Sequence, residues 1–369
     1  MRALIVSAST GYGHNSASRA LVCAFKRAGI QAECVDFYEV CGRVSYSIMD
    51  KGYVFVTRHM KKSYRRAYGL LERSGRCRSI YSAAAGRLLL ARRFLRKFDL
   101  SSFDVILTTH PYVAQEFNML KSHHLLNIPV VSIITDYCIQ PFFEECKYLD
   151  AIVISSPRLK TSALEKGLDP VRVFPLGLPV DNSFLSLPST NEARISLGFE
   201  PDKDTVLVMG GSMGYGNIYS VVTGLLNICG DVQIICVCGT NVNLFRSLSN
   251  LEDKRLLVLG FTNKMALCMS AADCAVTKPG GLTVAELLVT GLPAVIFSPI
   301  PGQEERNCRF ITGTGGAVYA ESPRDAANKI MSLLSDKKQL LNMKEALSKV
   351  ATPSAADDIC ALAVHLAGR

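Results

Sequence analysis

Three glycine-rich turns in the sequence have residue types and spacing that suit a phosphate or a reacting hydroxyl group. The first is SASTGYGH, where Gly11 and Gly13 follow an apolar run and His14 opens a helical pattern. Glycines allow a sharp turn after a strand, and the free amides at a helix start favour an anion. Because the ordinary pKa of histidine lies near physiological pH, His14 is a candidate general base. A capping or structural histidine is the alternative. A dinucleotide fingerprint is not complete, since Ser16 stands where its third glycine would be.

A second glycine-rich turn, residues 206–218 (VLVMGGSMGYGNI), lies between an apolar run and a helical pattern. Backbone amides in such a turn can surround a phosphate, and the start of the following helix favours negative charge. A Walker loop is excluded, because no Gly-Lys-Ser/Thr follows the glycines. A tight turn needed only for packing is the alternative. The candidate phosphate contacts are Gly211, Ser212, Gly214 and Gly216.

The third and most specific run is TKPGGLTVAELLVTGLPAVIFSPIPGQEERN, residues 277–307. Gly280 and Gly281 open a helix, and Glu286 lies five residues into it. An acidic side chain at such a place accepts ribose hydroxyl groups in nucleotide-binding folds. Three polar side chains after the next apolar run suit sugar hydroxyl groups: Gln303, Glu304 and Asn307. Ordinary strand–helix packing is the alternative interpretation of this run.

Two further polar residues end apolar runs. His110 ends VILTTH and Asp136 ends VVSIITD, and either could orient an acceptor hydroxyl group or His14. His14 and Asp136 are therefore the catalytic candidates. We expect no metal site, because Asp202 and Asp204 lie in a linker and suit a turn. Backbone amides and helix dipoles can neutralise a diphosphate without a cation.

The elements that must position these residues alternate along both halves of the chain. Short apolar runs are followed by helical patterns, which is typical of α/β folds with parallel sheets and helices on both faces. A proline-rich, polar stretch at 175–205 separates the halves. We expect two doubly wound domains, residues 1–178 and 179–354. Ligands in such folds bind beyond the carboxyl ends of the strands, so a cleft between the two sheets should hold the candidate residues.

The composition fits a folded chain. Hydrophobic residues make up 49% and charged residues 20% of 369 positions, which excludes a disordered protein. The most apolar long window, 280–302, contains three prolines and a glutamate, so we expect no membrane span. The amino-terminal sequence lacks the pattern of a signal peptide. The cysteines, including Cys236 and Cys238, mostly lie in apolar runs, as expected of buried thiols in a reducing cytoplasm.

Positive charge is concentrated in one segment. Residues 58–98 contain thirteen Lys and Arg residues and only one acidic residue, Glu72. In RLLLARRFLRKF (87–98) the basic residues alternate with Leu and Phe at helical spacing, which favours docking on an anionic membrane surface. A solvated helix face is the alternative. No recognised nucleic-acid-binding motif accompanies the charge, so we expect no nucleic-acid partner. The candidate membrane contacts are Arg92, Arg93, Arg96 and Lys97.

Taken in order, four motifs resemble the monogalactosyldiacylglycerol synthase and processive diacylglycerol glucosyltransferase family: SASTGYGH, the TDY strand end, GGSMGYG and KPGGLTVAE…PIPGQEERN. This family is related to the enzyme that adds N-acetylglucosamine to the lipid-linked peptidoglycan precursor. The resemblance covers almost the whole chain. It implies a GT-B fold, in which two Rossmann-like domains face each other across a cleft and a last helix (about 355–369) packs back on the first domain.

The resemblance further implies an inverting, metal-independent transfer of a hexose from a UDP-sugar to a membrane lipid such as diacylglycerol. The UDP-sugar is a substrate, and no cofactor is expected. The first domain would bind the acceptor, with His14 as base and with Gly11, Gly13 and His110 nearby. The second would bind the donor, with Gly239, Asn241, Phe261 and Met265 around the uracil, Glu286 at the ribose, and Gln303 and Glu304 at the hexose. The expected location is the cytoplasmic face of the cell membrane, as a peripheral protein.

Several alternatives remain open at this point. Gln303 and Glu304 suit either glucose or galactose. A UDP-N-acetylglucosamine 2-epimerase, an N-acetylglucosaminyltransferase acting on the lipid-linked peptidoglycan precursor, and a non-enzymatic lipid- or nucleotide-sensing protein are the competing functions. The sequence also departs from the family at two places. Tyr12 replaces the middle glycine of the first turn, and Gln140 in CIQPFF stands where the family has a histidine near an aromatic pair.

Overall fold

A computed structural model describes residues 1–8, 12–42, 84–228 and 230–368. Within it the chain forms two compact units. The amino-terminal unit contains Met1–Asp181, Pro301–Gln303 and Thr352–Arg369, and the carboxy-terminal unit contains Asn182–Ile300 and Glu304–Ala351. Each unit is built on a parallel sheet of six strands with helices around it, and these sheets confirm the predicted α/β fold class with two Rossmann-like domains.

The sheet of the amino-terminal unit has the strand order β2-β1-β3-β4-β5-β6. Its strands are β1 (Arg2–Ser7), β2 (Gln31–Asp36), β3 (Val105–Thr108), β4 (Val130–Ile133), β5 (Ala151–Val153) and β6 (Val173–Phe174). The α-helices are α1 (Tyr12–Arg27), α2 (Phe37–Cys41), α6 (Ala84–Lys97), α7 (Pro111–Ser122), α8 (Lys160–Glu165) and α17 (Ala355–Ala367), with 3₁₀ turns η1 (Pro141–Glu145), η2 (Pro157–Leu159) and η3 (Pro170–Arg172).

Register brings the carboxyl ends of three strands of this sheet together. Val6 of β1 pairs with Thr108 of β3, and Thr108 pairs with Ser132 of β4. The residues that follow β1, β3 and β4 therefore lie side by side at one edge, although about a hundred residues separate β1 from β3 along the chain.

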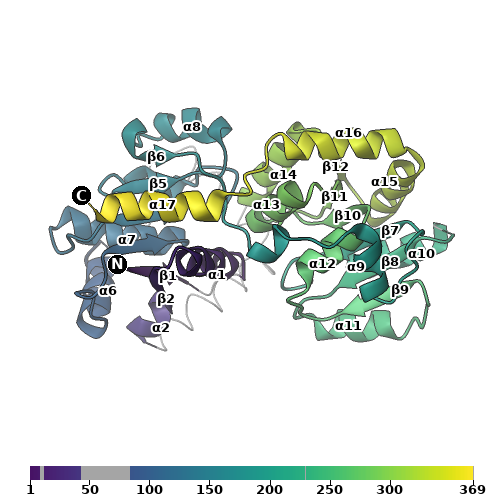
Figure 1. Cartoon of the computed structure of the whole chain (residues 1–369), viewed down its shortest axis with the longest axis horizontal. Helices are drawn as coiled ribbons and strands as arrows, with labels where there is room; N and C mark the ends of the chain where they lie inside the picture. Colours follow the sequence, from purple (N-terminus) through teal and green to yellow (C-terminus); the bar gives the residue numbers. More distant parts are fainter. Residues whose placement is uncertain (9–11, 43–83, 229, 369) are drawn as a thin grey trace. The chain divides into compact units, whose positions relative to one another are not determined.

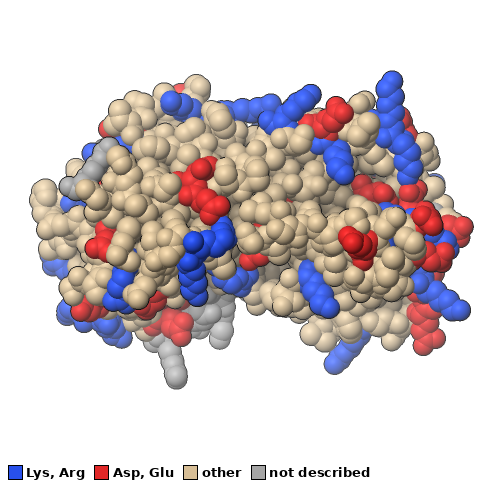
Figure 2. Space-filling view, viewed as in Figure 1, with Lys and Arg blue, Asp and Glu red and all other residues tan. Residues whose placement is uncertain are grey.

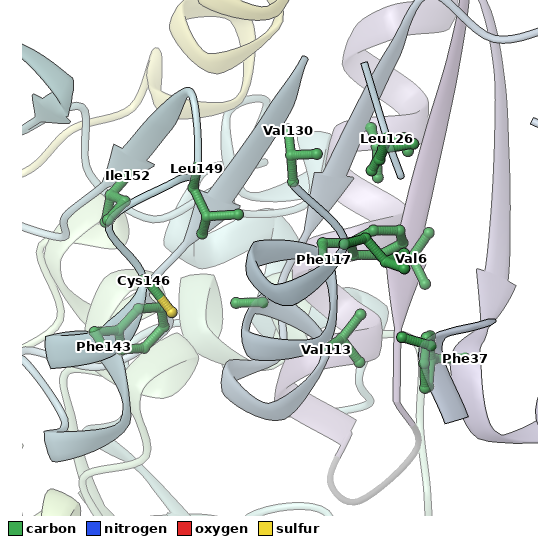
Figure 3. Packing of buried hydrophobic residues seen from close by; sticks show 14 of the residues in the cluster. Val6, Phe37, Val113, Phe117, Leu126, Val130, Phe143, Cys146, Leu149 and Ile152 are labelled. Atoms are coloured by element: carbon green, nitrogen blue, oxygen red, sulfur yellow. The ribbon is translucent and has the colours of Figure 1, made fainter. Parts of the chain in front are cut away.

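A cluster of aromatic side chains fixes the helices on one face of this sheet. Phe37 of α2 stacks on Phe94 of α6 with ring centroids 4.9 Å apart, and both rings meet Phe117 of α7 edge to face. Figure 3 shows Phe37 and Phe117 packed with Val6 of β1 and Val130 at the start of β4. Buried aromatic residues contribute much of the packing energy of such a core. On α6 this cluster leaves Arg92, Arg93, Arg96 and Lys97 exposed.

The last helix packs on the first. Contacts join α17 to α1 and to β3. At the surface an ion pair links Arg27 of α1 to Asp357 of α17, with 2.6 Å between Nη2 and Oδ1. The carboxy-terminal residues from Thr352 onward are thus part of the amino-terminal unit.

The sheet of the carboxy-terminal unit has the order β12-β11-β10-β7-β8-β9. Its strands are β7 (Thr205–Met209), β8 (Gln233–Val237), β9 (Leu256–Leu259), β10 (Cys274–Thr277), β11 (Ala294–Phe297) and β12 (Ala317–Ala320). The helices are α9 (Thr190–Ser196), α10 (Ile218–Ile228), α11 (Val242–Ser249), α12 (Met265–Ala271), α13 (Gly281–Thr290), α14 (Gln303–Gly313), α15 (Pro323–Ser335) and α16 (Lys337–Ser348), and η4 (Asn182–Phe184) is a 3₁₀ turn.

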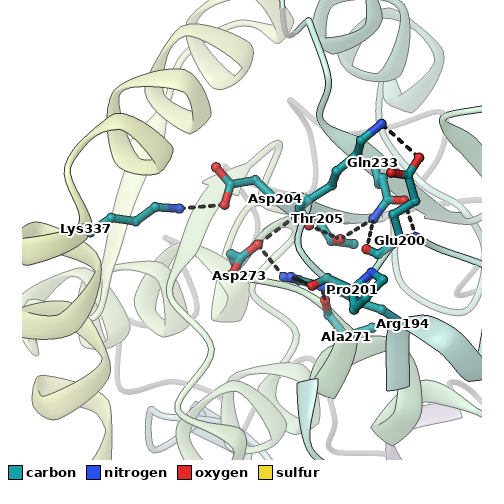
Figure 4. Close-up of polar contacts among 10 residues, drawn as sticks. Arg194, Glu200, Pro201, Asp204, Thr205, Gln233, Ala271, Asp273 and Lys337 are labelled. Carbon is teal, nitrogen blue, oxygen red and sulfur yellow. Dashed lines mark hydrogen bonds and ion pairs between the residues drawn. The ribbon is translucent and has the colours of Figure 1, made fainter. Parts of the chain in front are cut away.

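A buried arginine ties the central strands of this sheet together at their amino ends (Figure 4). Arg194 of α9 binds Asp273 with 2.6 Å between Nη2 and Oδ2, and it donates to the carbonyls of Ala271 and Pro201. Asp273 also accepts from the backbone of Thr205, the first residue of β7. Each nitrogen of this buried guanidinium therefore donates one hydrogen bond, and removal of either member of the ion pair would leave the other charge buried without its partner. The network fixes β7 and β10, the two strands that carry the glycine turns of this unit.

The distribution of surface charge and the hydropathy of the helices bear on contact with a membrane. On the face drawn in Figure 2, basic and acidic side chains are interspersed over both units. Among the helices that the structure describes, none combines the length and the hydropathy needed to cross a bilayer.

Candidate functional site

His14 is the centre of the polar site in the amino-terminal unit. It lies in the first turn of α1, half-buried, with Nδ1 2.6 Å from the carbonyl oxygen of Thr109 and 3.2 Å from Oγ1 of Thr135. A carbonyl oxygen only accepts, so Nδ1 carries the proton that it donates. In the neutral ring, Nε2 is then left as the basic nitrogen. This tautomer is the one that a general base needs.

Hydroxyl groups around Thr109 hold the first turn of α1 against the strand ends. Oγ1 of Thr109 lies 3.0 Å from the hydroxyl oxygens of both Ser7, at the end of β1, and Ser18 of α1. Ser18 in turn donates to the carbonyl of His14. The backbone that carries His14 is therefore fixed from two sides, and its ring is fixed by the carbonyl of Thr109.

A second histidine lies against the first. The ring of His110 meets that of His14 edge to face, with centroids 4.6 Å apart and an interplanar angle of 66°. Burial lowers the pKa of His14, opposed by the hydrogen bond to Thr109 and by the negative charge of Asp136. Burial holds the pKa of His110 well below its ordinary value, and a protonated His14 would lower it further. Both shifts favour neutral rings at pH 7.

Asp136 is held beside this pair of histidines. It follows β4 and is buried, with Oδ2 2.6 Å from the amide nitrogen of Gln140 and with its carbonyl accepting from Ser155. Gln140 thus fixes the carboxylate whose charge acts on His14. The three candidate residues His14, His110 and Asp136 come together, as polar residues at neighbouring strand ends should. Gly13 is exposed beside them, and Gly11 lies outside the described residues.

The site of the carboxy-terminal unit is built from backbone. Gly211, Gly214 and Gly216 all have positive φ, and a Cβ at Gly214 would lie 2.2 Å from the carbonyl oxygen of Cys238. Ser212 accepts at its carbonyl from the amide of Thr240. The turn after β7 is therefore packed backbone to backbone against the turn after β8, and side chains are excluded from the contact.

Gly239 and Asn241 shape the same contact. A Cβ at Gly239 would lie 2.2 Å from the carbonyl oxygen of Ser212. Asn241 caps α11 by accepting from the amide of Leu244, and its amide group donates to the carbonyl of Gly214 over 3.2 Å. These two residues, predicted at the uracil, thus also hold the glycine turn in its conformation. Phe261 is exposed after β9, and Met265 is the first residue of α12.

The third predicted run lies on β10, α13, β11 and α14. Gly280 and Gly281 begin α13, and no side chain caps this helix start. Asn307 is fully buried and donates to the carbonyl of Pro279, so it fixes the turn rather than facing outward. Glu286 of α13 and Gln303 at the start of α14 are half-buried.

Lys278 is the residue of this site that the sequence interpretation missed. Its Nζ lies 2.5 Å from Oε1 of Glu304, and both side chains are largely buried. The other carboxylate oxygen of Glu304 accepts from the amide of Ile300 over 2.8 Å. The position of Lys278 directly after a strand, within TKPGG, was the available signal. Thr109 and Thr135 of the amino-terminal unit were missed in the same way, although each follows an apolar run.

The basic residues of α6 form a separate feature. Arg92, Arg93, Arg96 and Lys97 are exposed, whereas Ala91 and Phe94 of the same helix are buried in the core. The remaining basic residues from 58 to 83 lie outside the described residues. Among the described residues, no group of His, Cys, Asp or Glu has the arrangement of a metal site.

Comparisons with known proteins cover both units. Residues 14–180 match the monogalactosyldiacylglycerol synthase family, and residues 205–359 match the glycosyltransferase family 28 C-terminal domain. A processive diacylglycerol beta-glucosyltransferase of Staphylococcus aureus (strain MRSA252) is 25% identical over 371 residues, which cover 99% of this chain and 93% of that protein.

Two solved structures support the fold. MurG of Acinetobacter baumannii aligns with a TM-score of 0.65 and 19% identity over 99% of each chain. Alr3699/HepE of Anabaena, solved in complex with UDP and glucose, aligns with a TM-score of 0.58 and 12% identity over 99% of each chain. The architecture is therefore GT-B, as predicted. The amino-terminal unit therefore carries a monogalactosyldiacylglycerol synthase domain, the carboxy-terminal unit carries a glycosyltransferase family 28 C-terminal domain, and the chain is a glycosyltransferase.

Proposed function

We propose that this glycosyltransferase moves a hexose from a UDP-sugar to a diacylglycerol-type lipid, with inversion at the anomeric carbon and without a metal ion. The observation that carries the proposal is the hydrogen bond from Nδ1 of His14 to Thr109, because it leaves Nε2 as a base. The name of the Staphylococcus aureus relative supports a lipid acceptor. The complex of HepE with UDP and glucose supports a UDP-sugar donor.

In the proposed reaction, Nε2 of His14 takes the proton of the acceptor hydroxyl group. The freed oxygen attacks the anomeric carbon of the hexose, and the bond between that carbon and the diphosphate oxygen breaks. UDP leaves with the electron pair of the broken bond, and a single displacement inverts the configuration. General-base assistance of this kind contributes about 10² to 10⁴-fold to a rate. Asp136 stabilises the imidazolium form of His14 that results.

The donor is assigned to the glycine turns of the carboxy-terminal unit. Amide groups of the turn from Gly211 to Gly216 that donate to no carbonyl within the turn, and amide groups at the start of α13 from Gly281 onward, would bind the diphosphate. Donors that are fixed before the reaction stabilise the charge that develops on the leaving group. Glu286 would bind the ribose, and Gln303 would contact the hexose. A bound metal ion is not required in this scheme, and no cofactor takes part.

The membrane contact is assigned to α6. Its four exposed basic residues, Arg92, Arg93, Arg96 and Lys97, would bind anionic headgroups on the cytoplasmic leaflet, at about 1 kcal/mol for each charge near the surface. Replacing all four by glutamine should weaken binding to anionic vesicles, and added salt should reproduce the loss. Neutral vesicles serve as the control. Vesicle binding that responds neither to the substitutions nor to salt would contradict this assignment.

The test of the overall function is product identification. The protein is incubated with a panel of UDP-sugars and vesicles that contain diacylglycerol, in the presence of EDTA. We expect a lipid product heavier by one or more hexose units, and free UDP in equal amount to the hexose transferred. An epimerised free nucleotide sugar with no lipid product would instead identify an epimerase. Absence of any turnover, with vesicle binding intact, would favour a sensing protein.

A further inference from the structure

Lys278 lies between the glycine turn after β7 and the glycine turn after β10. It directly follows β10, and the last pair between β10 and β7 is Thr277 with Met209. The turn after each strand therefore starts at the same edge of the sheet. A Cβ built on Gly211 would lie 2.6 Å from Cε of Lys278, and a Cβ built on Gly280 would lie 4.0 Å from its Nζ. The lysine side chain thus occupies space that only glycine leaves open in the first turn.

The ammonium group is held there by a carboxylate that is itself fixed. Glu304 binds Nζ of Lys278 with Oε1 and the backbone amide of Ile300 with Oε2. The side chains of Lys278 and Glu304 are 14% and 9% exposed, so neither moves freely in water. Because both oxygens of Glu304 have these partners, this carboxylate positions the lysine.

The ammonium group retains capacity for a ligand. Within the described part of the chain, Glu304 is the only group that Nζ of Lys278 contacts by a hydrogen bond. An ammonium has three N–H donors, so two remain. A fixed positive charge beside a glycine turn and a helix start that no side chain caps is an arrangement that stabilises a polyanionic leaving group.

We propose that Lys278 binds the diphosphate of the nucleotide sugar and supplies the positive charge that a metal ion supplies in metal-dependent transferases, with Glu304 as its positioning residue. This inference rests on the proposed function, because it assumes a nucleotide diphosphate at the glycine turns. It assigns Lys278 a role in both ground-state binding and departure of the diphosphate. It also reassigns Glu304, which the sequence places at the hexose, to the support of this lysine.

The experiment compares ligands that differ only in the number of their phosphate groups. Affinities for UDP, UMP and uridine are measured by titration on the full chain in EDTA. The variants are Lys278→Met, which keeps the length of the side chain but removes its charge, and Lys278→Arg, which keeps the charge. We expect Lys278→Met to lower the ratio of UDP affinity to uridine affinity at least tenfold, and Lys278→Arg to retain most of that ratio. Millimolar Mg²⁺ should restore part of the UDP affinity of Lys278→Met and leave that of the wild type unchanged.

The outcomes separate this inference from the proposed function. If Lys278→Met lost the same affinity for uridine as for UDP, or lost no affinity for UDP, the proposed role of Lys278 would be wrong. Binding of UDP by the wild type would still support the donor assignment in that case. If the wild type bound no UDP, both would fail. Should Lys278→Met not fold, Glu304→Gln gives a second route. It keeps the shape of the side chain but weakens the hold on Lys278, and we expect it to lower the UDP to uridine ratio several-fold without the same loss for uridine.

Discussion

Both units have a glycine-containing segment between a strand and a helix, but the chemistry beside it differs. In the amino-terminal unit the first turn of α1 carries His14, whose ring is fixed by the carbonyl of Thr109. In the carboxy-terminal unit the turns after β7 and β8 contact each other through backbone, at positions where Gly214 and Gly239 leave no room for a Cβ. The first arrangement leaves Nε2 of His14 able to accept a proton, and the second holds backbone amide groups in position to bind an anion.

This difference predicts that substitutions in the two units separate catalysis from binding. The largest effect is expected for His14→Ala, because it removes the proposed base and leaves the other unit intact. Turnover should fall by about 10² to 10⁴-fold, while affinity for UDP stays within about twofold. Initial rates with saturating donor and titration of UDP measure the two quantities. Turnover that survives the substitution would remove His14 from the role of base.

Gly214→Ala should show the opposite behaviour. Its Cβ would lie 2.2 Å from the carbonyl oxygen of Cys238, and φ is +55°, so the turn must move. Backbone strain of this kind costs about 1 to 3 kcal/mol, and we expect UDP affinity to fall at least tenfold. The matched control is Gly198→Ala, which has φ of +80° but no atom within 4 Å of the new Cβ. If both variants bound UDP like the wild type, the packed turn would not be the donor site.

A smaller effect concerns the pH dependence of turnover. Burial lowers the pKa of His14, so the neutral base is present at pH 7 and turnover should fall only at a pH below the ordinary value of about 6.5. Asp136 raises this pKa through its charge. Asp136→Asn should therefore move the acid limb of the profile to lower pH while UDP binding remains unchanged. A limb that stays in place would show that Asp136 does not act on His14.

Much of the architecture could be predicted from the sequence because it depends on local patterns. Apolar runs that alternate with helical patterns predicted two Rossmann-like domains, and the GT-B fold confirms this. The resemblance to the diacylglycerol glycosyltransferase family is confirmed by the matches to both units. The roles of the individual site residues stay predictions, although His14, His110 and Asp136 do lie together.

The features that the sequence did not predict depend on register and on contacts between distant residues. Lys278 and Glu304 are 26 residues apart, and their ion pair follows from the path of β11 and the start of α14. Thr109 and His14 are 95 residues apart, and their bond follows from the alignment of β1 with β3. A sequence pattern marks such residues as polar strand ends but does not say which of them meet.

The central claim is that amide groups and a lysine of the carboxy-terminal unit bind a uridine diphosphate without a metal ion. Titration calorimetry with UDP on the full chain, once in EDTA and once in Mg²⁺, tests this claim most directly. We expect saturable uptake with the same affinity in both solutions. No uptake, or uptake only in the presence of Mg²⁺, would contradict it.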